Sequence, residues 1–421
     1  MTWRAYDGLP VAEITNNWRC RTFADTYRSE TVTSAIRGVL HAVQPHAVHL
    51  HSLLNLSFEL PRIASDLHVP VVATLHDYTL VCPSGGQRVH RAEQHVCTVI
   101  DTERCVRCFR QSPFFAQIGF AAVAGAAPGQ DLVFRAARSI AHRVPGLTAR
   151  FLRGAQRAMP FPVTRRDVEE RLAHARSVFA DVDRWIAPSP AIAEEFLHLG
   201  IERSRVHVSD YGFVPLLRQA RSRPQRPLRI GYVGTLVWHK GVHVLLDAVR
   251  SLPPDSYEVT IHGDTSVFPD YTAALNAKAA GLRVHFAGGF NRDKAPAVYG
   301  GMDVLVVPSI WMENSPLVIH EAFMAGVPVV GTRIGGIPHL VQEGSTGLLY
   351  DASSPDALGT ILRHLVERPD VLVAMSARLA TSPGVKSIDD DARELEAMYE
   401  SLRTEKSRGG RSARAEHGRA S

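Results

Sequence analysis

The second half of the chain alternates between short apolar runs of strand length and segments in which apolar residues recur with a helical spacing. The expected strands are 228–233, 257–262, 283–287, 303–307, 328–331 and 347–350. The expected helices are 241–250, 271–280, 295–300, 317–325, a short one near 337, and 355–367. Strands that alternate with helices form a parallel sheet covered on both faces, so the pattern predicts an α/β, doubly wound domain. Ligands of such sheets bind at the carboxyl ends of the strands.

The first half repeats this alternation less regularly. Its expected strands are 46–50, 69–75, 184–187 and 205–209, and its expected helices are 31–43, 57–68 and 190–199. We therefore expect a first Rossmann-like domain at 1–217, with a cysteine-rich and basic insertion at 82–180. A linker at 218–227 would lead to a second Rossmann-like domain at 228–383. A helix at 386–403 is expected to pack back on the first domain, and 404–421 to form a disordered basic tail.

The net charge of +5 over 421 residues is concentrated near the C-terminus. Residues 404–421 contain five basic and two acidic side chains, which gives +3. Because this excess belongs to a tail, we expect no nucleic-acid partner. No segment reaches the roughly 18 apolar residues of a membrane span, and the first residues contain no apolar signal region. A cytoplasmic location is therefore expected.

A second basic block, 135–157, has six arginines and no carboxylate. Apolar residues are interleaved with these arginines, as in segments that lie peripherally on an anionic membrane surface. The same composition also fits the solvated faces of ordinary helices. Both interpretations stay open.

Two carboxylates, Glu313 and Glu321, stand eight positions apart around a turn and an apolar helical run. Eight helical residues rise roughly 12 Å, which is about the reach from the sugar to the ribose of a sugar nucleotide. The start of that helix presents free N–H groups, which suit a diphosphate. The alternative is an ordinary βαβ unit in which two acids happen to flank the helix.

A glycine and a lysine follow another strand of the same expected sheet. Gly234 ends the run 228–233, and Lys240 immediately precedes the next helix. A glycine after a strand lets the backbone approach a phosphate, and a lysine there supplies the matching cation. A surface lysine before a helix is common, so this signal gains weight only beside Glu313 and Glu321.

Several stretches resemble, in order and spacing, the nucleotide-sugar glycosyltransferases of family four. They are 233–242 (VGTLVWHKGV), 303–322 (DVLVVPSIWMENSPLVIHEA), 326–330 (GVPVV), the glycines at 335–336, and 344–349 (GSTGLL). A weaker match extends to 48–51, 74–78 and 186–189. The resemblance implies the GT-B fold, in which two Rossmann-like domains face each other across a cleft. It also implies transfer with retention and no catalytic metal.

The resemblance assigns a role to each matching side chain. Glu321 resembles the acid that takes the ribose hydroxyls, and Glu313 the one that holds the donor sugar near its reacting carbon. Lys240 resembles the cation that stabilises the leaving diphosphate. His76, at the end of a first-domain strand, matches the family's histidine that faces the donor sugar. Its alternative role is that of a satisfied histidine at a strand end.

The remaining donor-binding groups implied by the resemblance are mostly backbone. The N–H groups of Asn314, Ser315 and Leu317 would complete the diphosphate cradle, with Gly234 and Thr235 beside Lys240. The chain departs from the family at Thr235, where an arginine is usual, and at His339, where an acid is usual. The family's first strand and glycine-rich loop are also not found before residues 1–50, so the first domain is expected to be incomplete at its N-terminus.

The expected function is that of a retaining glycosyltransferase. It would move a sugar from a nucleotide-sugar donor to a hydroxyl of a glycan or lipid-linked acceptor, in cell-surface polysaccharide biosynthesis. The alternative is a non-catalytic nucleotide-sugar-binding or scaffold protein, derived from such an enzyme by N-terminal truncation.

Four of the five cysteines, Cys82, Cys97, Cys105 and Cys108, lie within one segment of the insertion. In a cytosolic protein such clustering favours metal binding over disulfides. A Cys-x2-Cys pair with two further thiolates fits a tetrahedral structural zinc site. Reduced buried thiols and redox chemistry are the alternatives.

Overall fold

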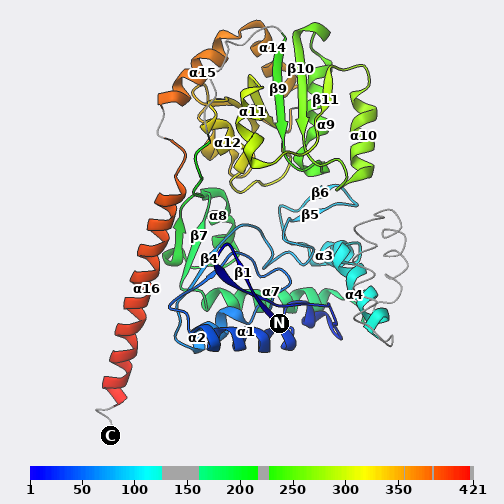
Figure 1. Ribbon diagram of the computed structural model, residues 1–421. Coiled ribbons are helices and arrows are strands. Elements are labelled where there is room, and N and C mark those ends of the chain that lie inside the picture. Colours follow the sequence, from blue (N-terminus) through cyan, green and yellow to red (C-terminus); the bar gives the residue numbers. More distant parts are fainter. Residues whose placement is uncertain (126–160, 217–226, 355, 382–383, 418–421) are drawn as a thin grey trace. The chain divides into compact units, whose positions relative to one another are not determined.

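The structure is a computed structural model that describes residues 1–125, 161–216, 227–354, 356–381 and 384–417 (Figure 1). The chain divides into two compact units, and each is described separately. The first unit comprises Met1–Ile186, Phe196–His207 and Glu396–Ser421, and the second comprises Ala187–Glu195 and Val208–Leu395. The basic block 135–157 and all but the last residue of the expected linker 218–227 lie outside the described residues.

The second unit is built on a six-stranded sheet in the order β11-β10-β9-β12-β13-β14. Its strands are β9 (Leu228–Val233), β10 (Tyr257–His262), β11 (Val284–Phe286), β12 (Val304–Val307), β13 (Val329–Thr332) and β14 (Gly347–Tyr350). Every pairing is parallel, with Ile230 of β9 beside Val259 of β10 on one side and Val304 of β12 on the other. The predicted parallel sheet is confirmed, and β9, β10 and β14 have the predicted bounds.

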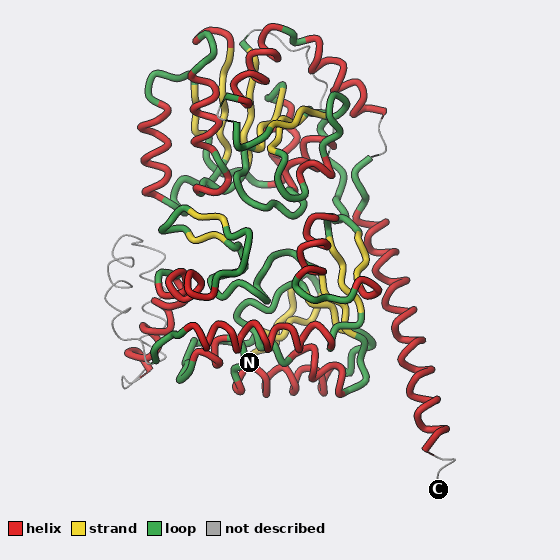
Figure 2. Tube along the Cα trace, turned by 180° about the vertical axis from the view of Figure 1, so that it is seen from behind, coloured by secondary structure: helices red, strands yellow, loops and turns green. Residues whose placement is uncertain are grey.

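Helices cover both faces of this sheet (Figures 1 and 2). They are α9 (Val242–Arg250), α10 (Pro269–Ala279), α11 (Ala295–Gly300), α12 (Leu317–Met324), α13 (Ile337–Leu340), α14 (Ala357–Glu367) and α15 (Asp370–Thr381). The sequence interpretation did not include α15. It nevertheless buries Leu372 and Met375, so tertiary packing holds this helix in place.

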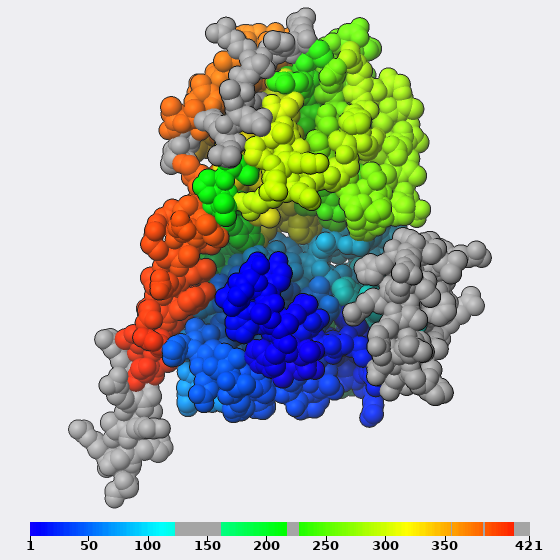
Figure 3. Space-filling model, viewed as in Figure 1, coloured from blue at the N-terminus to red at the C-terminus, as the bar shows by residue number. Residues whose placement is uncertain are grey.

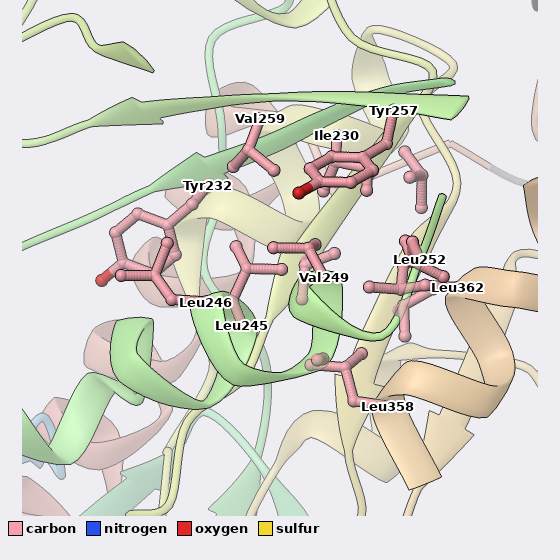
Figure 4. Packing of buried hydrophobic residues seen from close by; sticks show 14 of the residues in the cluster. Ile230, Tyr232, Leu245, Leu246, Val249, Leu252, Tyr257, Val259, Leu358 and Leu362 are labelled. Carbon is pink, nitrogen blue, oxygen red and sulfur yellow. The ribbon is translucent and has the colours of Figure 1, made fainter. Parts of the chain in front are cut away.

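The central strand β12 shows why the sheet is buried on both sides. Val304 and Val306 belong to the core under α9 and α14, whereas Leu305 and Val307 belong to the core under α11 and α12. Successive strand residues point to opposite faces, so a strand buried on both faces must be apolar at every position. Figure 4 shows the first of these cores, where Leu245 and Val249 of α9 meet the sheet.

The first unit contains a four-stranded sheet in the order β3-β4-β7-β8. Its strands are β3 (Val48–Leu50), β4 (Val71–Thr74), β7 (Arg184–Ala187) and β8 (Val206–Val208), and its main helices are α1 (Glu30–Val43), α2 (Leu60–Asp66) and α7 (Arg165–Ala180). The helix α8 (Pro190–His198) is divided between the units, because its residues up to Glu195 belong to the second. The pairs β3–β4 and β4–β7 are parallel. A parallel sheet with helices agrees with the predicted Rossmann-like character.

Two antiparallel hairpins of the first unit were not predicted. One joins β1 (Thr2–Tyr6) to β2 (Leu9–Glu13), and the other joins β5 (Val89–His90) to β6 (His95–Val96). Every residue of β1 is exposed, and this hairpin lies on the surface in Figure 3. The helices α3 (Thr102–Arg110) and α4 (Pro113–Gly125) follow the second hairpin.

The long C-terminal helix α16 spans Ile388–His417. It therefore continues through 404–417, where the sequence predicted disorder. Contacts within the first unit account for part of this extension, because Lys406 Nζ lies 2.9 Å from Asp183 Oδ2 and donates to the carbonyl of Val69. Among the described residues, the structure contains no helix with the length and apolarity needed to cross a membrane.

Candidate functional site

The central contact of the candidate site joins Lys240 to Glu313. Lys240 Nζ lies 2.7 Å from Glu313 Oε1 and 2.9 Å from Oε2, so the ammonium is shared by both carboxylate oxygens. Lys240 ends a short 3-10 helix (Trp238–Lys240) that follows β9, and Glu313 follows β12, the neighbouring strand. The parallel sheet therefore brings together, at its carboxyl edge, two residues that are 73 positions apart in the chain.

The two partners of this ion pair are buried to different degrees. The Glu313 side chain is 6% exposed and the Lys240 side chain is 30% exposed. Burying a carboxylate is costly unless a cation or several hydrogen-bond donors pair with it. The ammonium also lies 5.3 Å from the centre of the Trp311 ring, which adds a cation–π contact. A diphosphate that enters this site would have to share the ammonium with Glu313.

Three glycines allow the loops around Glu313 to approach one another closely. A Cβ on Gly241 would stand 1.8 Å from the carbonyl oxygen of Pro308, and a Cβ on Gly336 would stand 1.6 Å from that of Asn314. Gly335 adopts a φ of +58°, and the N–H of Gly336 donates to the carbonyl of Glu313. The loops after β9, β12 and β13 are thus packed backbone against backbone at the site.

Glu321, the second acid, is held by a tyrosine that the sequence interpretation missed. Tyr299 of α11 donates its hydroxyl hydrogen to Glu321 Oε2 over 2.5 Å. Burial, reinforced by the nearby carboxylate, raises the pKa of Tyr299 far above its ordinary value, so this hydroxyl remains a donor. One oxygen of Glu321 is thereby fixed in direction.

The side chains of Asn314 and Ser315 tie the turn before α12 to two other segments. Asn314 accepts a hydrogen bond from Ser189 and donates one to the hydroxyl of Tyr211. Ser315 donates to Asp210 Oδ1 over 2.7 Å. The predicted phosphate-binding role of the backbone N–H groups of Asn314, Ser315 and Leu317 stays a prediction. The turn that carries them is held in place by side chains.

Gly234 and Thr235 directly follow β9. The N–H of Gly234 donates to the carbonyl of His262, and the carbonyl of Thr235 accepts a bond from the Tyr232 hydroxyl. Gly234 has a φ of +152°, which favours glycine. Thr235 is exposed, so its side chain is accessible at the position where the family usually has an arginine.

His76 belongs to the first unit and therefore to a different unit from Lys240 and Glu313. It follows β4 and lines a pocket together with His51, Asp77 and Thr74. Its Nε2 lies 2.9 Å from Nδ1 of His51. Burial and the neighbouring His51 lower the pKa of His76, against a smaller opposing effect of Asp77, which favours the neutral imidazole. Its catalytic role stays a prediction.

The four clustered cysteines line a single pocket of the first unit. Cys82 precedes the hairpin β5–β6, Cys97 follows it, and Cys105 and Cys108 lie on α3. None forms a disulfide, and burial raises the pKa of Cys105 to about 12 and that of Cys108 to about 11. Within the part of the chain that the structure describes, no three His, Cys, Asp or Glu side chains are placed as a group able to hold a metal ion. Structural zinc therefore remains a prediction.

The parallel sheets define an α/β protein in which a basic and an acidic group, Lys240 and Glu313, meet at the carboxyl edge of one sheet. Residues 214–380 match the family model described as glycosyl transferases group 1. The resemblance seen in the sequence is confirmed there.

Similar proteins agree with this assignment. A D-inositol 3-phosphate glycosyltransferase of Corynebacterium urealyticum is 34% identical over 196 residues, which cover 44% of this chain and 46% of the relative. The sulfoquinovosyl transferase SQD2 of Arabidopsis thaliana is 30% identical over 200 residues, covering 44% and 38%. The chain spans about half the length of the inositol-phosphate glycosyltransferases it matches.

The fold is shared with solved glycosyltransferases of the GT-B class. The crystal structure of HepE from Anabaena, in complex with UDP, superposes with a TM-score of 0.58 and 18% identity, over 89% of this chain and 84% of that one. At this identity the likeness concerns the fold. The predicted class, α/β with two Rossmann-like units, is confirmed.

Proposed function

We propose that this protein is a retaining glycosyltransferase that uses a nucleotide-sugar donor. The observation that carries the proposal is the Lys240–Glu313 pair at the carboxyl edge of the second unit's sheet. A cation held against a mostly buried acid, beside the N-terminus of α12, is a ready site for an anionic leaving group.

Each group has a defined task in the proposed reaction. As the bond between the sugar and the diphosphate breaks, negative charge develops on the diphosphate, and Lys240 offsets that charge. Glu313, released from part of its contact with the ammonium, turns its carboxylate to the sugar hydroxyls. Glu321, oriented by Tyr299, takes the ribose hydroxyls. The proposal assigns no nucleophile, and Glu313 acts by positioning the donor.

The finer assignments rest on the family resemblance. We propose as acceptor a hydroxyl of a glycan or lipid-linked molecule, in the synthesis of a cell-surface polysaccharide at the cytoplasmic face of a membrane. His76 would act on the donor sugar, and peripheral membrane contact would involve 135–157, which the structure does not describe.

The proposal is tested by the release of nucleoside diphosphate from UDP-, GDP- and ADP-linked hexoses, with and without glycan acceptors. We expect turnover with one of these donors and a loss of roughly a hundredfold or more in Glu313→Ala. Glu367→Gln, which changes an exposed glutamate of α14, is the matched control and should turn over normally.

Turnover that persists unchanged in Glu313→Ala would overturn the assigned site. Donor binding by the wild type without transfer to any glycan acceptor would instead favour the non-catalytic nucleotide-sugar-binding protein.

A further inference from the structure

The segment just before the matched family region is bonded to the donor motif through a triangle of three polar side chains. Asp210 Oδ1 accepts a hydrogen bond from Ser315 Oγ over 2.7 Å, and Asp210 Oδ2 lies 3.2 Å from His320 Nε2. The third side of the triangle is a 2.8 Å contact between Ser315 Oγ and His320 Nε2. Ser315 and His320 are each 6% exposed. The Asp210 side chain is 27% exposed, so the three groups satisfy one another at a place that is buried at Ser315 and His320 and reaches solvent at Asp210.

The triangle contains a serine, a histidine and an aspartate, but its geometry is not that of a nucleophilic triad. In such a triad the histidine uses its two ring nitrogens separately, one toward the serine and the other toward the aspartate. Here Ser315 and Asp210 both contact Nε2 of His320. The serine also donates directly to the carboxylate, so this arrangement fixes positions and does not activate the hydroxyl.

The carboxylate of Asp210 is stabilised in its ionised form. Burial alone would raise its pKa, but hydrogen bonding and charge from His320, with further bonds from Ser315 and the N–H of Tyr211, bring the pKa below its ordinary value. Lys386 donates to the main-chain carbonyl of Asp210 and pairs with Asp391 and Glu394. Asp210 therefore directs its negative charge at Ser315 and His320.

Both contacts of Asp210 lie inside the stretch that carries the two acids. Ser315 stands two positions after Glu313, and His320 stands immediately before Glu321. The neighbouring residues reinforce this connection, because the Phe213 ring stacks on His320 at 4.6 Å and the Tyr211 hydroxyl accepts from Asn314. Asp210, Tyr211 and Phe213 together contact three positions between 314 and 320.

We propose that Asp210 is a positioning residue for the donor site. It holds Ser315 and His320, which set the direction of the first turn of α12 and, through it, the places of Glu313 and Glu321. This inference rests on the proposed function, because its consequence is the affinity for a nucleoside diphosphate. Small displacements of a binding group cost large factors, so loss of the contact should be measurable.

The test measures the affinities of UDP, GDP and ADP for the full-length chain by calorimetry. Asp210→Asn preserves the shape and removes the charge. We expect this variant to bind the diphosphate preferred by the wild type with an affinity that is lower by roughly tenfold or more. Asp270→Asn, an exposed aspartate of the same unit, is the matched control and should bind as the wild type does.

A double-mutant cycle separates positioning from a general structural role. If Asp210 acts through Ser315, the variant that combines Asp210→Asn with Ser315→Ala should bind no more weakly than the weaker single variant. Losses that add, or a lowered melting temperature with unchanged affinity, would overturn the inference. If Asp210→Asn does not fold, Ser315→Ala alone tests the inference. We expect this variant to bind the diphosphate more weakly than the wild type, and unchanged binding would contradict the inference.

Diphosphate binding by the wild type shows whether a negative result concerns the proposed function or only the role of Asp210. A wild type that binds none of the three diphosphates would overturn the proposed function and this inference with it. A wild type that binds one of them, with equal affinity in Asp210→Asn, would overturn this inference alone.

Discussion

The ammonium of Lys240 lies 2.7 and 2.9 Å from the two carboxylate oxygens of Glu313, in contact with an acid that is almost wholly buried. This pair has two consequences. It contributes to the stability of the fold, because the lysine offsets the cost of burying the Glu313 carboxylate. Under the proposed function it also prepares a donor site, because a diphosphate would compete for the same cation.

Breaking the pair from the lysine side should destabilise the protein. Lys240→Met leaves the carboxylate of Glu313 without its cation, and we expect a loss of about 3 kcal/mol in the free energy of unfolding. That is the lower end of the range for a broken buried pair, because the lysine side chain is 30% exposed. Urea unfolding measures the change.

The matching variants make this prediction specific. Lys294→Met, at an exposed lysine, should unfold like the wild type. Lys240→Met combined with Glu313→Gln should recover part of the lost stability, since no buried charge is left. A Lys240→Met protein as stable as Lys294→Met would show that the pair contributes nothing.

The hydroxyl of Tyr299 should determine how strongly the site distinguishes a ribose from a 2′-deoxyribose. Tyr299→Phe removes the bond to Glu321 and should reduce the preference for a nucleoside diphosphate over its 2′-deoxy form. A lost bond of this kind is worth about 1–3 kcal/mol, or roughly fivefold to a hundredfold in affinity. Tyr271→Phe, which loses a bond to His243, is the control. Equal discrimination in both variants would argue against a ribose-binding Glu321.

The cysteine cluster predicts a measurable metal content. If Cys82, Cys97, Cys105 and Cys108 hold zinc, elemental analysis of the purified protein should find one zinc per chain, and Cys105→Ser should lose it. Cys20→Ser, which changes a buried cysteine that does not line the pocket of the other four, should retain it. Protein without zinc, whose four thiols titrate freely in the native state, would contradict the prediction.

The sheet of the second unit could be predicted because its strands leave a strong signal. A strand such as Val304–Val307 is apolar at every position, since it is buried on both faces, and glycines and polar turns bound it. The hairpin of Thr2–Tyr6 and Leu9–Glu13 leaves no comparable signal. Its residues are largely exposed, so its sequence need not alternate.

The candidate site was predictable only in part. Lys240, Glu313 and Glu321 stand in stretches that resemble a family, and the structure brings Lys240 and Glu313 into contact. The partners Tyr299 and Asp210 were missed, because neither stands in a stretch that resembles the family. The residues that flank Tyr299 in the sequence do not indicate that its hydroxyl contacts Glu321.

The most direct test of the account is the affinity of the protein for nucleoside diphosphates before and after Lys240→Met. We predict that the wild type binds UDP, GDP or ADP more tightly than the corresponding monophosphate. In Lys240→Met this preference should fall by roughly tenfold or more, with Lys294→Met unchanged. The assignment of Lys240 to a diphosphate-binding site would be contradicted by a wild type that does not distinguish diphosphate from monophosphate. It would also be contradicted by a Lys240→Met protein that keeps the full preference.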